Sequence, residues 1–149
     1  MATVSVERDL AIPTTPERVW EQLADPATWS HWSVNHVSFS GDVPELAPGA
    51  TFGEHLQVRK APAEVAWTVE EASAPTRLAL RGKGPFAMKV EHTYTVTPEG
   101  DGTRVSVSLS LSATALRPMA GALTKELAKN LPETLERLRD RLVAEPAAT

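Results

Sequence analysis

The chain contains no cysteine, so disulfide bonds, thiol nucleophiles and thiolate metal sites are all excluded. No stretch approaches the roughly 18 consecutive apolar residues that a membrane-spanning helix needs. The first residues also lack the basic and apolar regions of a secretory signal peptide. These absences predict a cytoplasmic protein without a membrane span, and 149 residues are enough for one domain with a substantial core.

Several classes of functional site are absent as well. The formal net charge is −4, which argues against nucleic acid or another polyanion as a partner. The turn from Gly82 to Pro85 has no phosphate-binding Walker pattern, and no segment resembles the nucleophile elbow of a hydrolase. The histidines include no i,i+4 pair and no flanking acidic cluster, so neither a metal nor a cofactor is expected. They are His31, His36, His55 and His92.

Alternating apolar and polar residues predict a series of β-strands. The alternation is clearest over 105–112, where valine and leucine face one way and serine the other. A long strand over 86–96 places His92 and Tyr94 on its apolar face. The remaining strands are predicted over 4–12, around Val37 and Phe39, and over 52–58, 65–69 and 78–80.

Two short helices are predicted after the first strand, and one long helix is predicted near the C-terminus. Thr15 and Asp25 are each followed by proline, and this pairing favours the start of a helix, because the side chain caps it and proline suits its first position. From Ala115 to Val143 apolar residues recur every three or four positions, which is the period of one helix face. Such a helix would be roughly 43 Å long and must lie against a broad sheet. Its apolar stripe consists of Leu116, Met119, Leu123, Leu127, Leu131, Leu135, Leu138 and Leu142.

The order is therefore one strand, two short helices, six strands and a long helix. This order and five segments of the sequence together resemble a known superfamily. The segments are Ile12-Pro-Thr-Thr-Pro-Glu-Arg-Val-Trp20, Asp25-Pro-Ala-Thr-Trp-Ser-His-Trp32, Pro48-Gly49, Gly100-Asp-Gly-Thr-Arg-Val105 and Asn130-Leu-Pro-Glu-Thr-Leu-Glu-Arg-Leu138. Over essentially its whole length the chain resembles the START-like, helix-grip superfamily (SRPBCC), and within it the single-domain bacterial polyketide cyclase/dehydrase-like branch. The resemblance implies one α+β ligand-binding domain over 1–149, with a loose tail at 145–149. Its seven-stranded antiparallel curved sheet would surround the C-terminal helix, with two short helices after the first strand.

In such a fold the concave sheet face is the wall of a cavity, so polar residues on that face are the informative ones. Strand alternation places His92, Tyr94 and Glu54 there, and these three are the catalytic candidates. A histidine can transfer protons, a phenol can hydrogen-bond an enolate or carbonyl oxygen, and Glu54 can either act as a second base or orient the histidine. The alternative is that they only orient a ligand. Arg8 falls on the same face, where it would either reach the open end or pair with Glu54.

The predicted ligand is a small hydrophobic molecule, polyketide-like or lipid-like, and cyclase or dehydratase activity is one hypothesis for what happens to it. A second hypothesis, from another class, is a non-enzymatic toxin of a bacterial two-gene toxin–antitoxin module. The oligomeric state is left open, with a homodimer as one option. The predicted ligand-binding residues are Trp32, Phe52, Glu54, Leu56, Trp67, Met88, Val90, His92, Tyr94, Leu127, Asn130 and Leu131.

Overall fold

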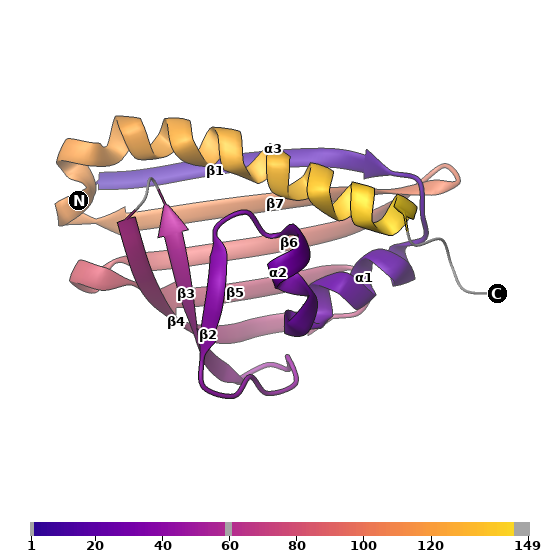
Figure 1. Cartoon of the computed structure of the whole chain (residues 1–149), viewed down its shortest axis with the longest axis horizontal. Helices are drawn as coiled ribbons and strands as arrows, with labels where there is room; N and C mark the ends of the chain where they lie inside the picture. Colours follow the sequence, from indigo (N-terminus) through magenta and orange to yellow (C-terminus); the bar gives the residue numbers. More distant parts are fainter. Residues whose placement is uncertain (1, 59–60, 145–149) are drawn as a thin grey trace.

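The computed structural model describes residues 2–58 and 61–144, so the expected tail at 145–149 lies outside the described residues. A seven-stranded antiparallel sheet curves around one long helix, which confirms the predicted helix-grip fold (Figure 1). The elements in chain order are β1 (Ala2–Ile12), α1 (Pro16–Ala24), the 3₁₀ helix η1 (Pro26–Thr28), α2 (Trp29–Trp32), β2 (His36–Ser40), β3 (Thr51–Val58), β4 (Ala61–Ser73), β5 (Arg77–Lys83), η2 (Pro85–Ala87), β6 (Lys89–Glu99), β7 (Gly102–Ala113), η3 (Thr114–Met119) and α3 (Ala120–Ala144).

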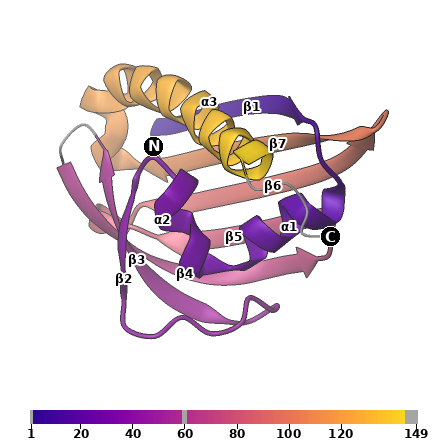
Figure 2. The same cartoon turned by 45° about the vertical axis from the view of Figure 1, so that its right-hand side comes forward.

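The strand order across the sheet is β1-β7-β6-β5-β4-β3-β2, so β1 and β2 form its two edges. The first strand of the chain pairs with the last, and every other neighbour is joined by a consecutive connection. Helix α3 lies on the concave side, close to β1, and α1 and α2 lie beside its C-terminal half on the same side (Figure 2). The concave face and the inner side of α3 together enclose the core.

Both short helices begin where the sequence predicts. The Thr15 hydroxyl accepts a hydrogen bond from the backbone N–H of Arg18, and Pro16 occupies the first turn of α1. The Asp25 carboxylate accepts from the N–H of Ala27 at the start of η1, which leads directly into α2. These caps turn the chain twice after β1 and bring α2 against α3.

The start of the long helix differs from the prediction of one helix from Ala115. Residues 114–119 form the 3₁₀ helix η3, and the α-helix begins only at Ala120. Pro118 lies inside η3, and a proline lacks the N–H that an α-helical hydrogen bond requires. Met119, expected on the apolar stripe, is 48% exposed, whereas the leucines from Leu123 onward are buried as predicted.

Strand β2 also departs from simple alternation. Strict alternation would put Val37 and Phe39 on one face of the strand, but Val37 is 56% exposed and Phe39 is partly buried against the core. The register of β2 against β3 shifts between His36 and Ser38, as a β-bulge does when it adds one residue to a strand. The inner face therefore carries His36 and Phe39, whose ring centroids are 4.6 Å apart.

Candidate functional site

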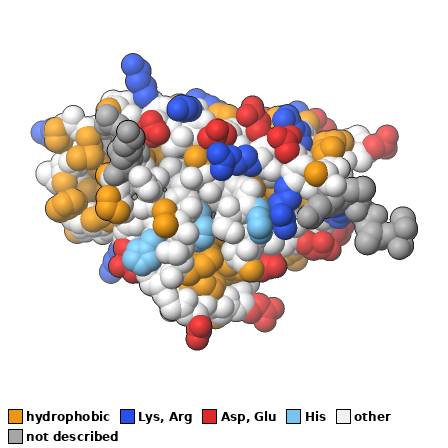
Figure 3. Space-filling model, in the orientation of Figure 1, with side chains coloured by type: hydrophobic (Ala, Val, Ile, Leu, Met, Phe, Trp, Pro, Cys, Tyr) orange, Lys and Arg blue, Asp and Glu red, His pale blue; other side chains and the backbone are white. Residues whose placement is uncertain are grey.

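A cavity of about 570 Å³ lies between α3 and the concave face of the sheet. Leucine, valine, methionine and tryptophan side chains supply most of its wall, and they come from α2, β3, β4, β6 with the residue before it, β7, η3 and α3. At one end the lining includes Phe86 of η2 and Met119 of η3, which are 80% and 48% exposed, so the cavity opens to solvent there. Hydrophobic side chains gather on the surface at the end of the molecule where α3 begins (Figure 3). The cavity thus has an apolar interior and an apolar mouth.

Ten of the twelve residues predicted to bind ligand line this cavity, and the two exceptions are Phe52 and Asn130. They come from α2, β3, β4, α3, and β6 with the residue just before it. Because strand and helix periodicity place them, no special local geometry is needed to bring them together. The ten are Trp32, Glu54, Leu56, Trp67, Met88, Val90, His92, Tyr94, Leu127 and Leu131.

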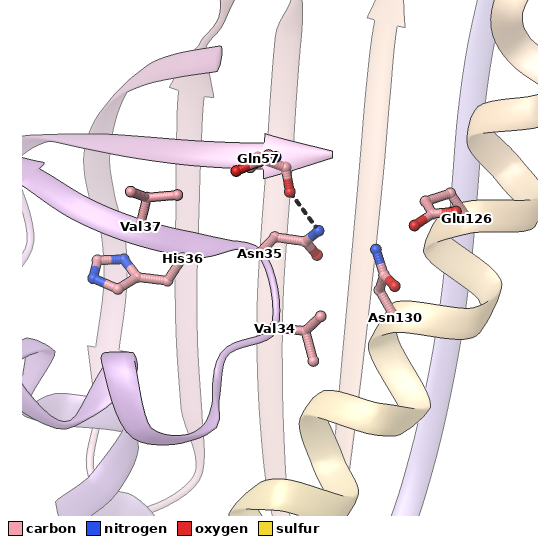
Figure 4. Close-up of a pocket in the computed structure, with 7 residues that line it drawn as sticks. All are labelled: Val34, Asn35, His36, Val37, Gln57, Glu126 and Asn130. Carbon is pink, nitrogen blue, oxygen red and sulfur yellow. Dashed lines mark hydrogen bonds between the residues drawn. The ribbon is translucent and has the colours of Figure 1, made fainter. Parts of the chain in front are cut away.

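Phe52 and Asn130, both predicted to bind the ligand, do not line this cavity. The Phe52 ring packs against those of Trp29 and Phe39, with centroids 5.9 Å apart in each pair, and of these three aromatic residues Trp29 lines the cavity. Asn130 lies on a neighbouring face of α3 and lines a different, open pocket of about 510 Å³ at the surface. In that pocket it faces Asn35, whose side-chain amide donates a hydrogen bond of 2.9 Å to the carbonyl of Gln57 (Figure 4).

The Glu54 carboxylate is held by two buried donors. The indole Nε1–H of Trp67 donates to Oε1 at 2.9 Å, and Oε2 lies 2.6 Å from Nδ1 of His36. The side chains of His36 and Glu54 are only 4% and 5% exposed. Burial of a carboxylate requires such partners, because an unpaired charge in an apolar interior is strongly unfavourable. Arg8 is not one of them: it is exposed, and its guanidinium donates to the carbonyl of Glu7.

His36 is the site residue that the sequence analysis did not identify. Strict alternation would put His36 on the face opposite Val37 and Phe39, and the bulge in β2 brings it to the same face as Phe39. It then connects two regions, because it is among the residues that line the open surface pocket while its Nδ1 contacts a carboxylate that lines the cavity. A glycine or proline signal, which marks many bulges, is absent from 34–40.

His92 and Tyr94 project from β6 toward the interior, with ring centroids 4.8 Å apart. Part of the His92 ring faces the cavity, but its Nε2 atom is covered and has no hydrogen-bond partner among residues 2–58 and 61–144. Burial lowers the pKa of His92 to about 4, so the imidazole is neutral near pH 7. Burial, followed by the charge of Glu54, raises the pKa of Tyr94 well above its usual value, so the phenol keeps its proton.

The cavity therefore offers an apolar container with a neutral imidazole and a protonated phenol. Within the described ranges, no group of three or more histidine, aspartate or glutamate residues is arranged to hold a metal ion. Over the same ranges, no helix is long and apolar enough to cross a membrane.

Comparison with known proteins agrees with this architecture. The crystal structure of TTHA0849 from Thermus thermophilus superimposes with a TM-score of 0.72 at 24% identity, covering 98% of this chain and 100% of that chain. Protein CV1439 from Chromobacterium violaceum gives a TM-score of 0.73 at 18% identity, covering 97% and 99%. At these identities the likeness is one of fold.

Sequence relatives and a family model give information beyond the likeness of fold. Toxin Rv0910 of Mycobacterium tuberculosis is 27% identical over 100 residues, which are 66% of this chain and 68% of the toxin. The model of a family described as polyketide cyclase / dehydrase and lipid transport matches residues 1–143. With its helix-grip fold and its match to that model, the chain belongs to the polyketide cyclase / dehydrase and lipid transport family.

Proposed function

We propose that this protein binds a small hydrophobic molecule, polyketide-like or lipid-like, in the cavity between α3 and the sheet. The supporting observation is the cavity itself, whose volume of about 570 Å³ falls within the roughly 300–1,000 Å³ of small-molecule sites. Its wall is apolar apart from six side chains, as expected when a few polar groups orient an otherwise hydrophobic ligand. The six are Ser33, Asn35, Glu54, His92, Tyr94 and Thr134.

Within this proposal His92 and Tyr94 orient the ligand. A buried polar atom without a partner is uncommon in native structures, and a donor group on a ligand is one way to satisfy Nε2 of His92 after a small rotation of the ring. The phenol of Tyr94 can donate to a ligand oxygen. Glu54 is committed to Trp67 and His36, so its role is to fix these side chains.

The same three residues, His92, Tyr94 and Glu54, are the candidates for cyclase or dehydratase chemistry. A general base works best when its pKa lies near the working pH. With a pKa of about 4, His92 is a weak base at pH 7. This favours binding and orientation of the ligand over proton abstraction by His92 at neutral pH.

The test fills the cavity by mutation and measures the binding of an uncharged fluorescent hydrophobic probe, N-phenyl-1-naphthylamine. Native mass spectrometry looks for co-purified molecules in parallel. Leu127 lines the cavity, and Leu127→Trp should lower probe affinity at least tenfold. Val143, on the same helix, is exposed, so Val143→Trp is the matched control and should leave affinity unchanged. Equal binding by both variants would contradict the proposal.

A second candidate, a toxin that acts without catalysis, is favoured by the name of the Mycobacterium tuberculosis relative. Inducible expression in a bacterial host tests it: growth arrest that persists in Leu127→Trp indicates a toxin acting independently of the cavity. Gene neighbours give a further test, because polyketide synthase genes favour a ligand-processing role and a small upstream antitoxin-like gene favours the toxin.

A further inference from the structure

The cavity wall carries few charged side chains. Among the described residues that line it there is no lysine, arginine or aspartate, and Glu54 is the acidic residue. The exposed cations that flank η2 and lie in η3, namely Lys83, Lys89 and Arg117, belong to the surface and do not line the cavity. An anionic group carried into the interior would therefore meet no cationic side chain from the described wall.

The two imidazoles near the interior do not supply the positive charge that an anionic ligand would need. His92 is neutral near pH 7, because its burial disfavours the charged form. His36 contacts Glu54 through Nδ1 at 2.6 Å, so this nitrogen is already engaged by the carboxylate and is not available to a ligand anion. What a ligand meets is thus an apolar wall with neutral hydroxyl and amide groups, a neutral imidazole and, as the charged side chain of the described lining, the Glu54 carboxylate.

We propose that this cavity selects uncharged hydrophobic ligands, such as alcohols, phenols, ketones or esters, and rejects carboxylates such as fatty acids. This inference rests on the proposed function, the binding of a small hydrophobic molecule. A carboxylate that leaves water needs paired donors or a counter-charge, and here it would instead lie near a second carboxylate. A neutral hydroxyl or carbonyl carries a much smaller desolvation penalty, and Tyr94 and His92 can hydrogen-bond it.

Matched naphthalene derivatives test the proposal by isothermal titration calorimetry at pH 7.5. Naphthalene, 2-naphthol and methyl 2-naphthoate are uncharged, whereas 2-naphthoate carries a carboxylate on the same ring system. We expect 2-naphthol and methyl 2-naphthoate to bind the wild-type protein at least about tenfold more tightly than 2-naphthoate. The comparison of ester with acid needs no variant, so it stands even where a substitution impairs folding.

Glu54→Gln then tests the source of the selectivity, because glutamine keeps an acceptor for the Trp67 indole and removes the charge. We expect this variant to narrow the ratio of 2-naphthol to 2-naphthoate affinity at least threefold. The matched control is Glu91→Gln, on β6 next to His92 but on the exposed outer face, and it should leave the ratio unchanged.

The possible outcomes test the charge selectivity and the proposed hydrophobic binding separately. If 2-naphthoate binds the wild-type protein as tightly as its ester, or if folded Glu54→Gln retains the wild-type ratio, the charge selection is wrong while hydrophobic binding stands. If none of the four compounds binds, the proposed function itself fails, and the inference with it.

Discussion

Replacing His36 with phenylalanine removes one of the two buried partners of the Glu54 carboxylate and keeps an aromatic ring beside Phe39. Loss of one partner of a buried charged group typically costs about 3–5 kcal/mol, because the remaining charge stays buried. The Trp67 indole still donates to Oε1, so we expect the lower end of this range, about 3 kcal/mol. At about 2.1 cal/mol/K per residue, the unfolding entropy of a 149-residue chain is about 0.3 kcal/mol/K, and Tm should fall by about 10 °C.

Urea denaturation followed by tryptophan fluorescence measures this loss. His55→Phe is the matched control, because His55 lies next to Glu54 on β3 but is 47% exposed, and its removal should cost less than about 1 kcal/mol. In a Glu54→Gln background the His36→Phe substitution should cost about 1 kcal/mol, which gives a coupling of about 2 kcal/mol between the two positions. Equal costs in both backgrounds would refute the reasoning, since the charge of Glu54 would then be irrelevant to the loss.

Two further predictions concern pH and packing. The folded pKa of His92, about 4, lies below the unfolded value of 6.5, so the unfolded state binds the extra proton and stability falls by up to about 3 kcal/mol as the pH drops from 6.5 to 4. Urea denaturation at pH 7 and at pH 4.5 measures the unfolding free energy that each protein loses between these two pH values. This loss should be about 2–3 kcal/mol smaller for His92→Leu than for the wild type; identical losses would contradict the burial of a neutral imidazole. A Cβ at Gly82 would lie 2.5 Å from Cγ1 of Val65 and 2.8 Å from Cε3 of Trp67, so Gly82→Ala should cost about 1–3 kcal/mol by the same assay. Gly121→Ala, where no atom lies within 4 Å, should be neutral or stabilise α3 by up to about 1 kcal/mol, and a destabilisation there would contradict this account.

Strand periodicity was enough to place the polar residues of β3 and β6. Side chains alternate strictly along a regular strand, so the apolar neighbours of Glu54, His92 and Tyr94 determined which way each side chain points. The family resemblance supplied what periodicity cannot, namely that the apolar face is concave and encloses a cavity. The helix-grip fold was therefore predictable in full outline.

The errors arise where the backbone leaves its regular period. One extra residue in β2 puts His36 on the inner face beside Phe39, which strict alternation along the strand does not indicate. The 3₁₀ turn around Pro118 rotated Met119 toward solvent at the mouth. Asn130 shows a different limit, because helix spacing predicts a broad inner face but not which of its residues reach the cavity and which reach a neighbouring pocket.

The two edges of the sheet bear on self-association. An edge strand exposes unpaired backbone groups that can recruit a strand from another molecule, and long, regular edges do so most readily. In this protein the eleven-residue edge β1 lies against α3, and the other edge, β2, has only five residues and an irregular register. The bulge that brings His36 to Glu54 thus also interrupts the edge that lies away from the long helix, so the same irregularity discourages strand-to-strand aggregation.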